Sequence, residues 1–402
     1  MTPTRRARAT GHPPTLVKRL RIGVLYGGRS GEHEVSLASA AAVFANLDRA
    51  RYEPTAIRIE KDGRWVLADR PPSAASAADV IDQMRSEAVR LRSGRDVVLP
   101  GRPGDDTLIL VDRRSPRTEE AEAAAAVTGL ALDVIFPVLH GPQGEDGTVQ
   151  GLLELANVAY VGCGVLASAV GMDKAVMKTL FRAAGLRVPD WTVVRRHAWR
   201  ERPDDVVAAI ETALPYPLFV KPANMGSSVG VSKAHDRESL NAAIALALDF
   251  DRKVIVEVAV PDAREIEVAV LGNTNPRASV PGEIVLASEF YDYNAKYVNA
   301  GSRTEVPASL DADTAAAVQR QALAAFEAID GSGLARVDFL LSRTSSELFV
   351  NEINTLPGFT AISMFAKLWS ASGVAFPALI DQLITLALER HAEKQIVRTS
   401  AF

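Results

Sequence analysis

The chain has 402 residues, a length that predicts about two to three domains. Apolar residues make up 48% and charged residues 23%, as in ordinary globular proteins, and the net charge of −4 argues against a nucleic-acid-binding surface as its main function. Cys163 is the single cysteine, so no intrachain disulfide can form, and a reducing cytoplasm fits the sequence. No apolar run approaches the ~18 residues that span a membrane.

Residues 1–20 form a basic, proline-containing stretch without the apolar core of a signal peptide, and we expect a disordered tail. A buried strand over residues 21–26, a glycine-rich turn and a helix over residues 35–47 then open an α/β domain of the nucleotide-binding kind. The turn lacks the G-x-G-x-x-G spacing, which argues against a Rossmann dehydrogenase. Glu32 and Glu34 lie near the helix start, where carboxylates either cap the helix or meet a substrate ammonium group.

Residues 60–130 are harder to interpret, with strand-like pieces at residues 65–67 and 108–111. A second buried strand, over residues 133–140, leads into a glycine-rich run and a helix over residues 148–156. Ligands of open α/β sheets bind beyond the carboxyl ends of strands, so His140 either contacts a ligand or belongs to the core. An amphipathic helix begins near residue 172 and ends at Gly185, a typical C-cap.

A lysine and a small-residue loop follow the apolar strand at residues 217–221. Lys221 ends the strand, and residues 226–230 supply two glycines and two serines. Such a loop exposes backbone N–H groups that bind anions, and a lysine adds a point charge suited to phosphate. The spacing is not that of a P-loop. The segment therefore predicts phosphate binding, with a plain hairpin turn and a surface lysine as the alternative.

Two further strands, over residues 253–260 and 264–272, precede a long polar connection. Glu265 and Glu267 share one face of the second strand, and the alternation predicts a solvated face. Residues 289–309 contain three tyrosines and Lys296. Long connections of this kind are often lids, so this loop either closes over a polyphosphate or is an exposed aromatic loop. A helix over residues 312–329 follows.

The last strong pattern is an antiparallel hairpin, with strands at residues 335–342 and 348–354 joined by a short turn. If the turn is centred on Ser345, Asp338 lies opposite Glu352 and Arg336 opposite Asn354. Facing carboxylates repel each other, and a bound Mg²⁺ or Mn²⁺ would remove that repulsion. The alternatives are a solvated strand face, or an Arg–Asp pair without a ligand.

Seven motifs, in order, resemble the D-alanine–D-alanine ligases of the ATP-grasp superfamily. They occupy residues 27–36, 139–148, 172–174, 220–230, 290–297, 335–338 and 351–358, and the resemblance covers about residues 21–390. It implies an α/β fold of three domains. These are a Rossmann-like amino-terminal substrate domain over residues 21–141, a central ATP-grasp subdomain over residues 142–230, and a carboxyl-terminal ATP-grasp subdomain over residues 231–402 with a lid loop at residues 289–309.

The resemblance also implies the reaction. Two D-alanines are joined at the expense of ATP through an acyl phosphate, in the cytoplasm, to supply peptidoglycan precursors. The implied cofactors are ATP and two Mg²⁺ or Mn²⁺ ions, and the implied assembly is a homodimer without a nucleic-acid or membrane partner.

Individual residues receive roles by the same resemblance. The nucleotide-binding residues are Lys174, Lys221, Ser228, Glu257, Val260, Glu265, Lys296 and Asn351, and the metal ligands are Asp338, Glu352 and Asn354. The catalytic residues are Glu32, Ser227, Tyr297, Arg336 and Gly358, and the D-alanine-binding residues are Glu32, His140, Ser363 and Met364. Glu32, Ser227 and Tyr297 form a hydrogen-bonded triad, whereas Arg336 and the Gly358 N–H stabilise the tetrahedral intermediate.

The sequence departs from the usual pattern at Val258, at Asn294 and in the pair at residues 365–366. Other functions stay open: another ATP-dependent carboxylate–amine ligase, a D-alanine–D-lactate ligase, or a nucleotide-binding scaffold without catalysis. The motif that ends in Tyr297 favours the dipeptide-forming type. The intact metal-ligand positions and Arg336 argue against a non-catalytic scaffold.

Overall fold

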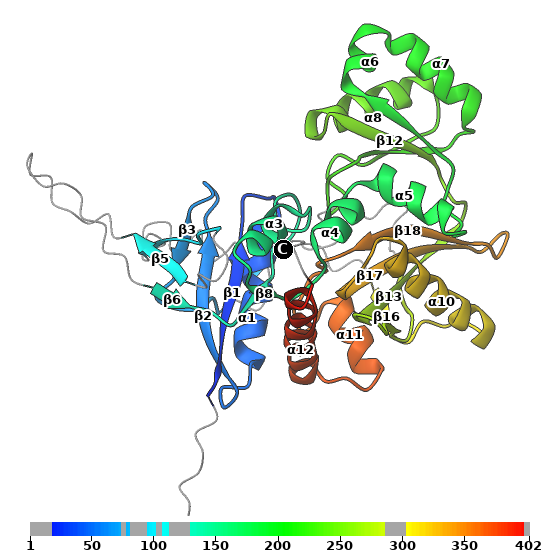
Figure 1. Ribbon diagram of the computed structural model, residues 1–402. Helices are drawn as coiled ribbons and strands as arrows, with labels where there is room; N and C mark the ends of the chain where they lie inside the picture. Colours follow the sequence, from blue (N-terminus) through cyan, green and yellow to red (C-terminus); the bar gives the residue numbers. More distant parts are fainter. Residues whose placement is uncertain are drawn as a thin grey trace, which may run out of the picture.

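The computed structural model describes residues 18–73, 78–80, 95–101, 107–111, 129–285 and 303–397. Residues 1–17 of the predicted tail and most of the predicted lid loop, including Asn294, Lys296 and Tyr297, lie outside the described residues. The described chain contains three sheets, which follow one another along the sequence (Figure 1).

The first sheet has eight strands in the order β6-β5-β4-β3-β2-β1-β7-β8. The parallel part comprises β1 (Leu20–Gly27), β2 (Tyr52–Ile59), β7 (Val134–Pro137) and β8 (Ala159–Tyr160). The antiparallel extension comprises β3 (Trp65–Leu67), β4 (Arg95–Val98), β5 (Thr107–Val111) and β6 (Gly129–Ala131). Helix α1 (His33–Asn46) follows β1, and α3 (Thr148–Leu155) follows β7. The predicted strands at residues 65–67 and 108–111 are confirmed as β3 and β5.

The second sheet is antiparallel, in the order β11-β10-β12-β9. Its strands are β9 (Trp191–Arg195), β10 (Leu218–Pro222), β11 (Ser232–Ala234) and β12 (Lys253–Val258), and its helices are α6 (Arg196–Glu201), α7 (Pro203–Ala213) and α8 (Arg237–Phe250). The glycine-rich loop connects β10 to β11, and these two strands pair directly. The predicted boundary between residues 230 and 231 therefore falls inside this sheet.

The third sheet has the order β16-β15-β13-β17-β18, with β14 paired to β13. Its strands are β13 (Ala263–Gly272), β14 (Arg277–Ala278), β15 (Gly282–Val285), β16 (Arg303–Glu305), β17 (Gly333–Ser342) and β18 (Leu348–Asn354). One face packs against α4 (Val165–Met172), α5 (Lys174–Ala183) and α10 (Ala312–Ala328). Asp173 is the N-cap of α5, so the helix predicted over residues 172–185 starts at Lys174.

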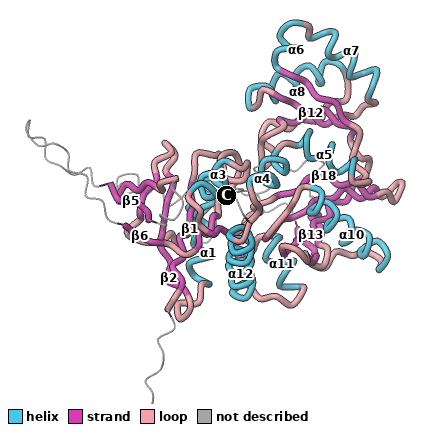
Figure 2. The backbone as a smooth tube through the Cα atoms, in the orientation of Figure 1, coloured by secondary structure: helices cyan, strands magenta, loops and turns pink. Residues whose placement is uncertain are grey.

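Helix α11 (Met364–Ala371) packs against β13 of the third sheet, and helix α12 (Phe376–Gln395) returns to the first sheet. Leu383 and Ile384 of α12 share a core with Val24 of β1 and Phe136 of β7. Helix α12 lies between α1 and α11 (Figure 2). Arg390 donates to the Tyr160 carbonyl at 3.0 Å and to Ser332 Oγ at 2.8 Å. Helix α12 therefore joins the first sheet to the third.

Within the described residues, no single helix is long and apolar enough to cross a membrane. Helices α11 and α12 pass that test only as a pair, which is bent by 101°.

Candidate active site

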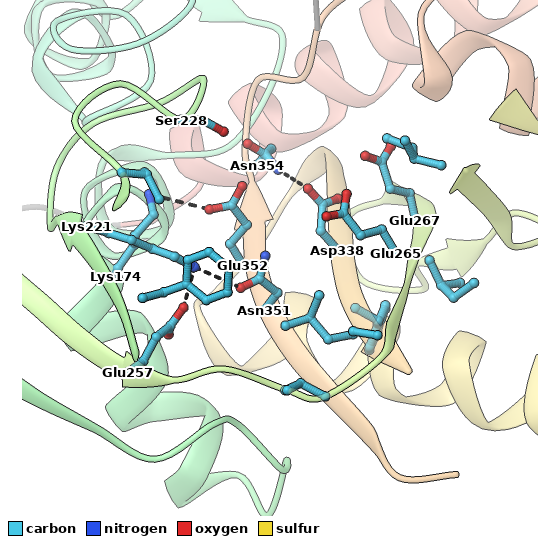
Figure 3. Close-up of a pocket in the computed structure, with 18 of the residues that line it drawn as sticks. Lys174, Lys221, Ser228, Glu257, Glu265, Glu267, Asp338, Asn351, Glu352 and Asn354 are labelled. Atoms are coloured by element: carbon cyan, nitrogen blue, oxygen red, sulfur yellow. Dashed lines mark hydrogen bonds and ion pairs between the residues drawn. The ribbon is translucent and has the colours of Figure 1, made fainter. Parts of the chain in front are cut away.

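A cavity of about 630 Å³ is lined by residues of both the second and the third sheet. Figure 3 shows side chains from the two sheets facing each other across it. The predicted site residues that line the cavity are Lys174, Lys221, Ser227, Ser228, Glu257, Val260, Glu265, Asp338, Asn351, Glu352 and Asn354. Residues as far apart in the sequence as Lys174 and Asn354 thus line the same cavity.

Two lysines reach the cavity, one from β10 of the second sheet and one from helix α5. In β10, the alternation buries Leu218 and Val220 and leaves Lys221 on the cavity face. Lys221 pairs with Glu257 and its Nζ lies 3.5 Å from Asn351 Oδ1. Lys174 is the first residue of α5, and its Nζ donates to the Met225 carbonyl of the glycine-rich loop at 2.8 Å.

Glu257 is a buried carboxylate between two lysines. One oxygen pairs with Lys221, and the other lies 2.9 Å from Lys178 Nζ of α5. Burial alone would raise the pKa of Glu257, but the two ammonium groups lower it to about 2. Burial lowers the pKa of Lys178, and Glu257 opposes that shift. Glu257 is therefore ionised throughout the neutral range.

The strand pairing of the hairpin agrees with the predicted register: Arg336 lies opposite Asn354, and Asp338 opposite Glu352. A bulge follows Asp338, so Asn351 has no partner in the ladder. Strict alternation would place Asn351 on the face opposite Glu352. Because of the bulge, both side chains reach the cavity, while Val350 and Ile353 on either side of them are buried.

Arg336 lies in a buried cluster of acidic groups. Its guanidinium donates to both oxygens of Asp338 at 2.7 Å and lies 3.0 Å from Glu267 Oε2. Burial opposes the guanidinium charge, but Asp338 and Glu267 raise the pKa of Arg336 well above its usual value. Glu267 is only 4% exposed, so the prediction of a solvated face was wrong at this position. It packs across from Asp338, its register partner in β17.

The loop before α1 meets the glycine-rich loop. Ser227 Oγ donates to Glu32 Oε1, which joins residues 195 positions apart. A Cβ atom at Gly226 would lie 3.0 Å from Glu32 Oε2, so glycine permits this approach. Glu32 makes no side-chain capping bond, although it occupies the N-cap position of α1, so the helix-capping alternative was wrong for it. Glu34 instead pairs with Lys61 at 2.6 Å.

Glu145 is a cavity residue that the sequence analysis missed. It is 8% exposed and accepts a hydrogen bond from the Gly141 N–H at 2.9 Å. Burial and the nearby Glu32 carboxylate raise the pKa of Glu145 to about 8. The feature of the sequence that could have indicated Glu145 is its position as an acidic residue inside the glycine-rich run at 141–147.

Six of the described predicted residues are not part of the cavity lining: Glu32 and Arg336, which contact the lining residues Ser227 and Asp338, and His140, Gly358, Ser363 and Met364. His140 is buried and donates from Nδ1 to the Leu356 carbonyl at 3.0 Å, which leaves Nε2 to accept from Ser39 Oγ at 3.1 Å. Gly358 follows in the same loop, and Ser363 occupies the N-cap position of α11 before the buried Met364. His140 therefore links α1 to the loop that carries Gly358.

Sequence comparisons match both parts of the chain. The family model described as the D-ala D-ala ligase N-terminus matches residues 21–163, and that described as the D-ala D-ala ligase C-terminus matches residues 180–385. The chain belongs to the D-alanine–D-alanine ligase family. The family identified from the seven motifs is thereby confirmed.

Individual relatives cover almost the whole chain. A D-alanine–D-alanine ligase from Heliobacterium modesticaldum is 50% identical over 374 residues, which are 93% of this chain and 96% of that protein. One from Bacillus cytotoxicus is 46% identical over 380 residues, 94% of this chain and 99% of that protein.

Solved structures confirm the predicted ATP-grasp fold class. The D-alanine–D-alanine ligase from Coxiella burnetii matches with a TM-score of 0.76 and 36% identity, covering 94% of this chain and 97% of that one. The VanG D-Ala:D-Ser ligase from Enterococcus faecalis matches with a TM-score of 0.78 and 33% identity, covering 92% of this chain and 100% of that one.

Proposed function

We propose that this chain joins two D-alanines to D-alanyl-D-alanine at the expense of ATP, and so supplies a peptidoglycan precursor. Family membership across both halves of the chain is the observation that carries the proposal. The cavity supports it, because it combines the lysines that phosphates need with the carboxylates that a divalent cation needs.

In this proposal ATP occupies the cavity between the second and third sheets. Lys174, Lys221 and the N–H groups around Ser228 bind the phosphates, since cations and small-residue loops neutralise their charge. Glu257 and Val260 hold the adenine side, Glu265 binds the ribose, and Asn351 supports Lys221. Lys296 would add a further cation from the lid loop.

The acidic wall fits a divalent metal by the chemistry of its donors. Asp338 and Glu352 face each other on the cavity side, and the Asn354 amide lies 3.0 Å from Asp338. These are hard oxygen donors of the kind that Mg²⁺ and Mn²⁺ prefer. The described residues contain no group of three or more His, Cys, Asp or Glu side chains that could hold a metal. In this proposal the Asn354 amide oxygen is the third protein ligand beside the two carboxylates. Bound ions, two in this proposal, would neutralise phosphate charge.

The proposed reaction has two steps. The carboxylate of the first D-alanine attacks the γ-phosphorus of ATP, which forms an acyl phosphate and releases ADP. The amine of the second D-alanine then attacks the acyl carbon, inorganic phosphate leaves, and the amine loses a proton. Positioning and charge neutralisation account for most catalysis in phosphoryl transfer.

This chain's residues bind and orient the two amino acids. Glu32, fixed by Ser227, receives the ammonium group of the first D-alanine, and Tyr297 completes the triad. His140 lies near this substrate, and Ser363 and Met364 bind the carboxylate of the second. Arg336 and the Gly358 N–H stabilise the tetrahedral intermediate, whose negative charge needs fixed donors. A homodimer and a cytoplasmic location complete the proposal.

The test is phosphate release from ATP with D-alanine, L-alanine, D-alanine plus D-serine, and D-alanine plus D-lactate, with products identified by mass. We expect the dipeptide from D-alanine alone and no product from L-alanine. The D-serine reaction is included because one structural neighbour is a D-Ala:D-Ser ligase. ATP turnover without D-alanyl-D-alanine, or a mixed product preferred over it, would contradict the proposed substrate.

A further inference from the structure

Helix α5 carries two lysines with different environments. Lys174 reaches the cavity, whereas Lys178, one helical turn later, is only 1% exposed and does not line the cavity. Lysine is almost never fully buried unless its charge is paired. The roles proposed above leave Lys178 without an explanation.

The contacts of Lys178 lead back to the cavity through Glu257. Lys178 Nζ lies 2.9 Å from Glu257 Oε2, and Glu257 Oε1 pairs with Lys221. The carboxylate therefore has one oxygen toward the protein interior and one toward the cavity wall. Lys221 is 14% exposed at that wall, where the proposed function places phosphate.

We propose that Lys178 is a positioning residue of the nucleotide site. It holds Glu257 from the interior side of the carboxylate, and Glu257 in turn fixes the Lys221 ammonium at the cavity wall. This inference rests on the proposed ATP-dependent function. Without Lys178, Glu257 keeps a single cation, and the buried carboxylate draws Lys221 inward to satisfy both oxygens. The phosphates of ATP then lose part of their cationic contact.

A purely structural role is the competing explanation, and the chain offers a matched control for it. Asp173 at the start of α5 pairs with Lys253, which lies on β12 as Glu257 does. Lys253 is 8% exposed. Both pairs fasten α5 to β12, but only the Lys178 pair includes a partner of Lys221. If Lys178 merely anchors the helix, removing Lys253 has the same effect.

The experiment compares wild type, Lys178→Met and Lys253→Met in steady-state ligation, with thermal unfolding as a check on folding. We expect Lys178→Met to raise KM for ATP about tenfold or more, because a charge-assisted contact to phosphate is weakened. The kcat at saturating ATP and KM for D-alanine should stay within about threefold in both variants, and Lys253→Met should keep its KM for ATP. An unchanged KM for ATP in Lys178→Met, or an equal rise in Lys253→Met, overturns the inference.

A comparison in the Glu257→Gln background keeps the test valid if Lys178→Met alone does not fold. Glu257→Gln and the double variant Lys178→Met/Glu257→Gln both lack the buried carboxylate that would be left underpaired. Because Lys178 acts through Glu257, the second substitution should change KM for ATP by less than about twofold in this background. A further tenfold rise would show that Lys178 acts independently and would overturn the inference. A wild-type protein that forms no dipeptide would contradict the proposed function instead.

Discussion

Two buried glutamates line the cavity in surroundings of opposite charge. Glu257 lies between the ammonium groups of Lys178 and Lys221, and its pKa falls to about 2. Glu145 lies near the carboxylate of Glu32, and its pKa rises to about 8. Burial acts on both in the same direction, so the neighbours decide the charge. The lysine-rich side suits an anion such as a polyphosphate, whereas the Glu32 side suits an ammonium group.

Substitution in the acidic wall should give the largest effect on activity. Its carboxylates distinguish this cavity from a site that binds anions alone. We expect Glu352→Gln to lower kcat by about 10²–10³-fold, the usual effect of losing one electrostatic stabiliser of a transition state. Initial rates over a Mg²⁺ titration measure it, and the midpoint should shift to higher Mg²⁺. Glu347→Gln, on the exposed turn of the same hairpin, is the control. A normal Mg²⁺ midpoint in Glu352→Gln would contradict the metal assignment.

A substitution on the lysine-rich side of the cavity should give the second-largest effect. Lys221→Met leaves Glu257 paired with Lys178 and removes the cation at the cavity wall. A charge-assisted hydrogen bond contributes about 1.5–3 kcal/mol, so we expect KM for ATP to rise about 10- to 100-fold. Lys394→Met, a half-exposed lysine of α12, should leave KM unchanged. A wild-type KM in Lys221→Met would mean that this lysine does not contact ATP.

The Glu32 side should show a smaller effect on the amino-acid substrate. Ser227→Ala removes the hydrogen bond to Glu32 but leaves its charge. We expect KM for D-alanine to rise about tenfold, since one hydrogen bond to a charged group is lost. Titrations of D-alanine at saturating ATP measure this effect, with the exposed Ser345→Ala as control. If only KM for ATP changed, the glycine-rich loop would serve the nucleotide and not the amino acid.

The smallest effect concerns stability as a function of pH. Folded protein keeps the Glu145 proton up to about pH 8, whereas the unfolded chain loses it near the ordinary value of 4.5. The stability contribution of this group is therefore complete below about pH 4.5 and is lost as the pH rises from there through 8. Glu145→Gln should flatten this decrease and raise Tm at pH 9 by a few degrees relative to wild type, which corresponds to about 1–2 kcal/mol.

Thermal unfolding at pH 6 and pH 9 checks this prediction, with Glu53→Gln, an exposed carboxylate of β2, as the matched control. A parallel loss of Tm in wild type and Glu145→Gln would assign the pH dependence to other groups.

Local patterns predicted the parts of the site that depend on local geometry. Alternation and a short turn were enough to place Asp338 opposite Glu352. The same alternation could not reveal the bulge at Asn351, because residues 350–352 contain neither glycine nor proline to mark it. Lysines on an amphipathic helix are expected on its exposed face, so the burial of Lys178 required knowledge of β12. Burial of Glu267 likewise depends on Arg336, a residue about 70 positions away.

The return of α12 to the first sheet determines when, during synthesis, that sheet can complete its core. Leu383 and Ile384 help to cover the sheet that contains Val24 and Phe136, yet they are synthesised more than 200 residues later. A nascent chain that has reached residue 163, where the amino-terminal family match ends, exposes this apolar face. Because synthesis proceeds at ~5–20 residues per second, this apolar face stays exposed for on the order of 10–40 seconds before α12 is made. The core of the first sheet is thus complete only after α12 has left the ribosome.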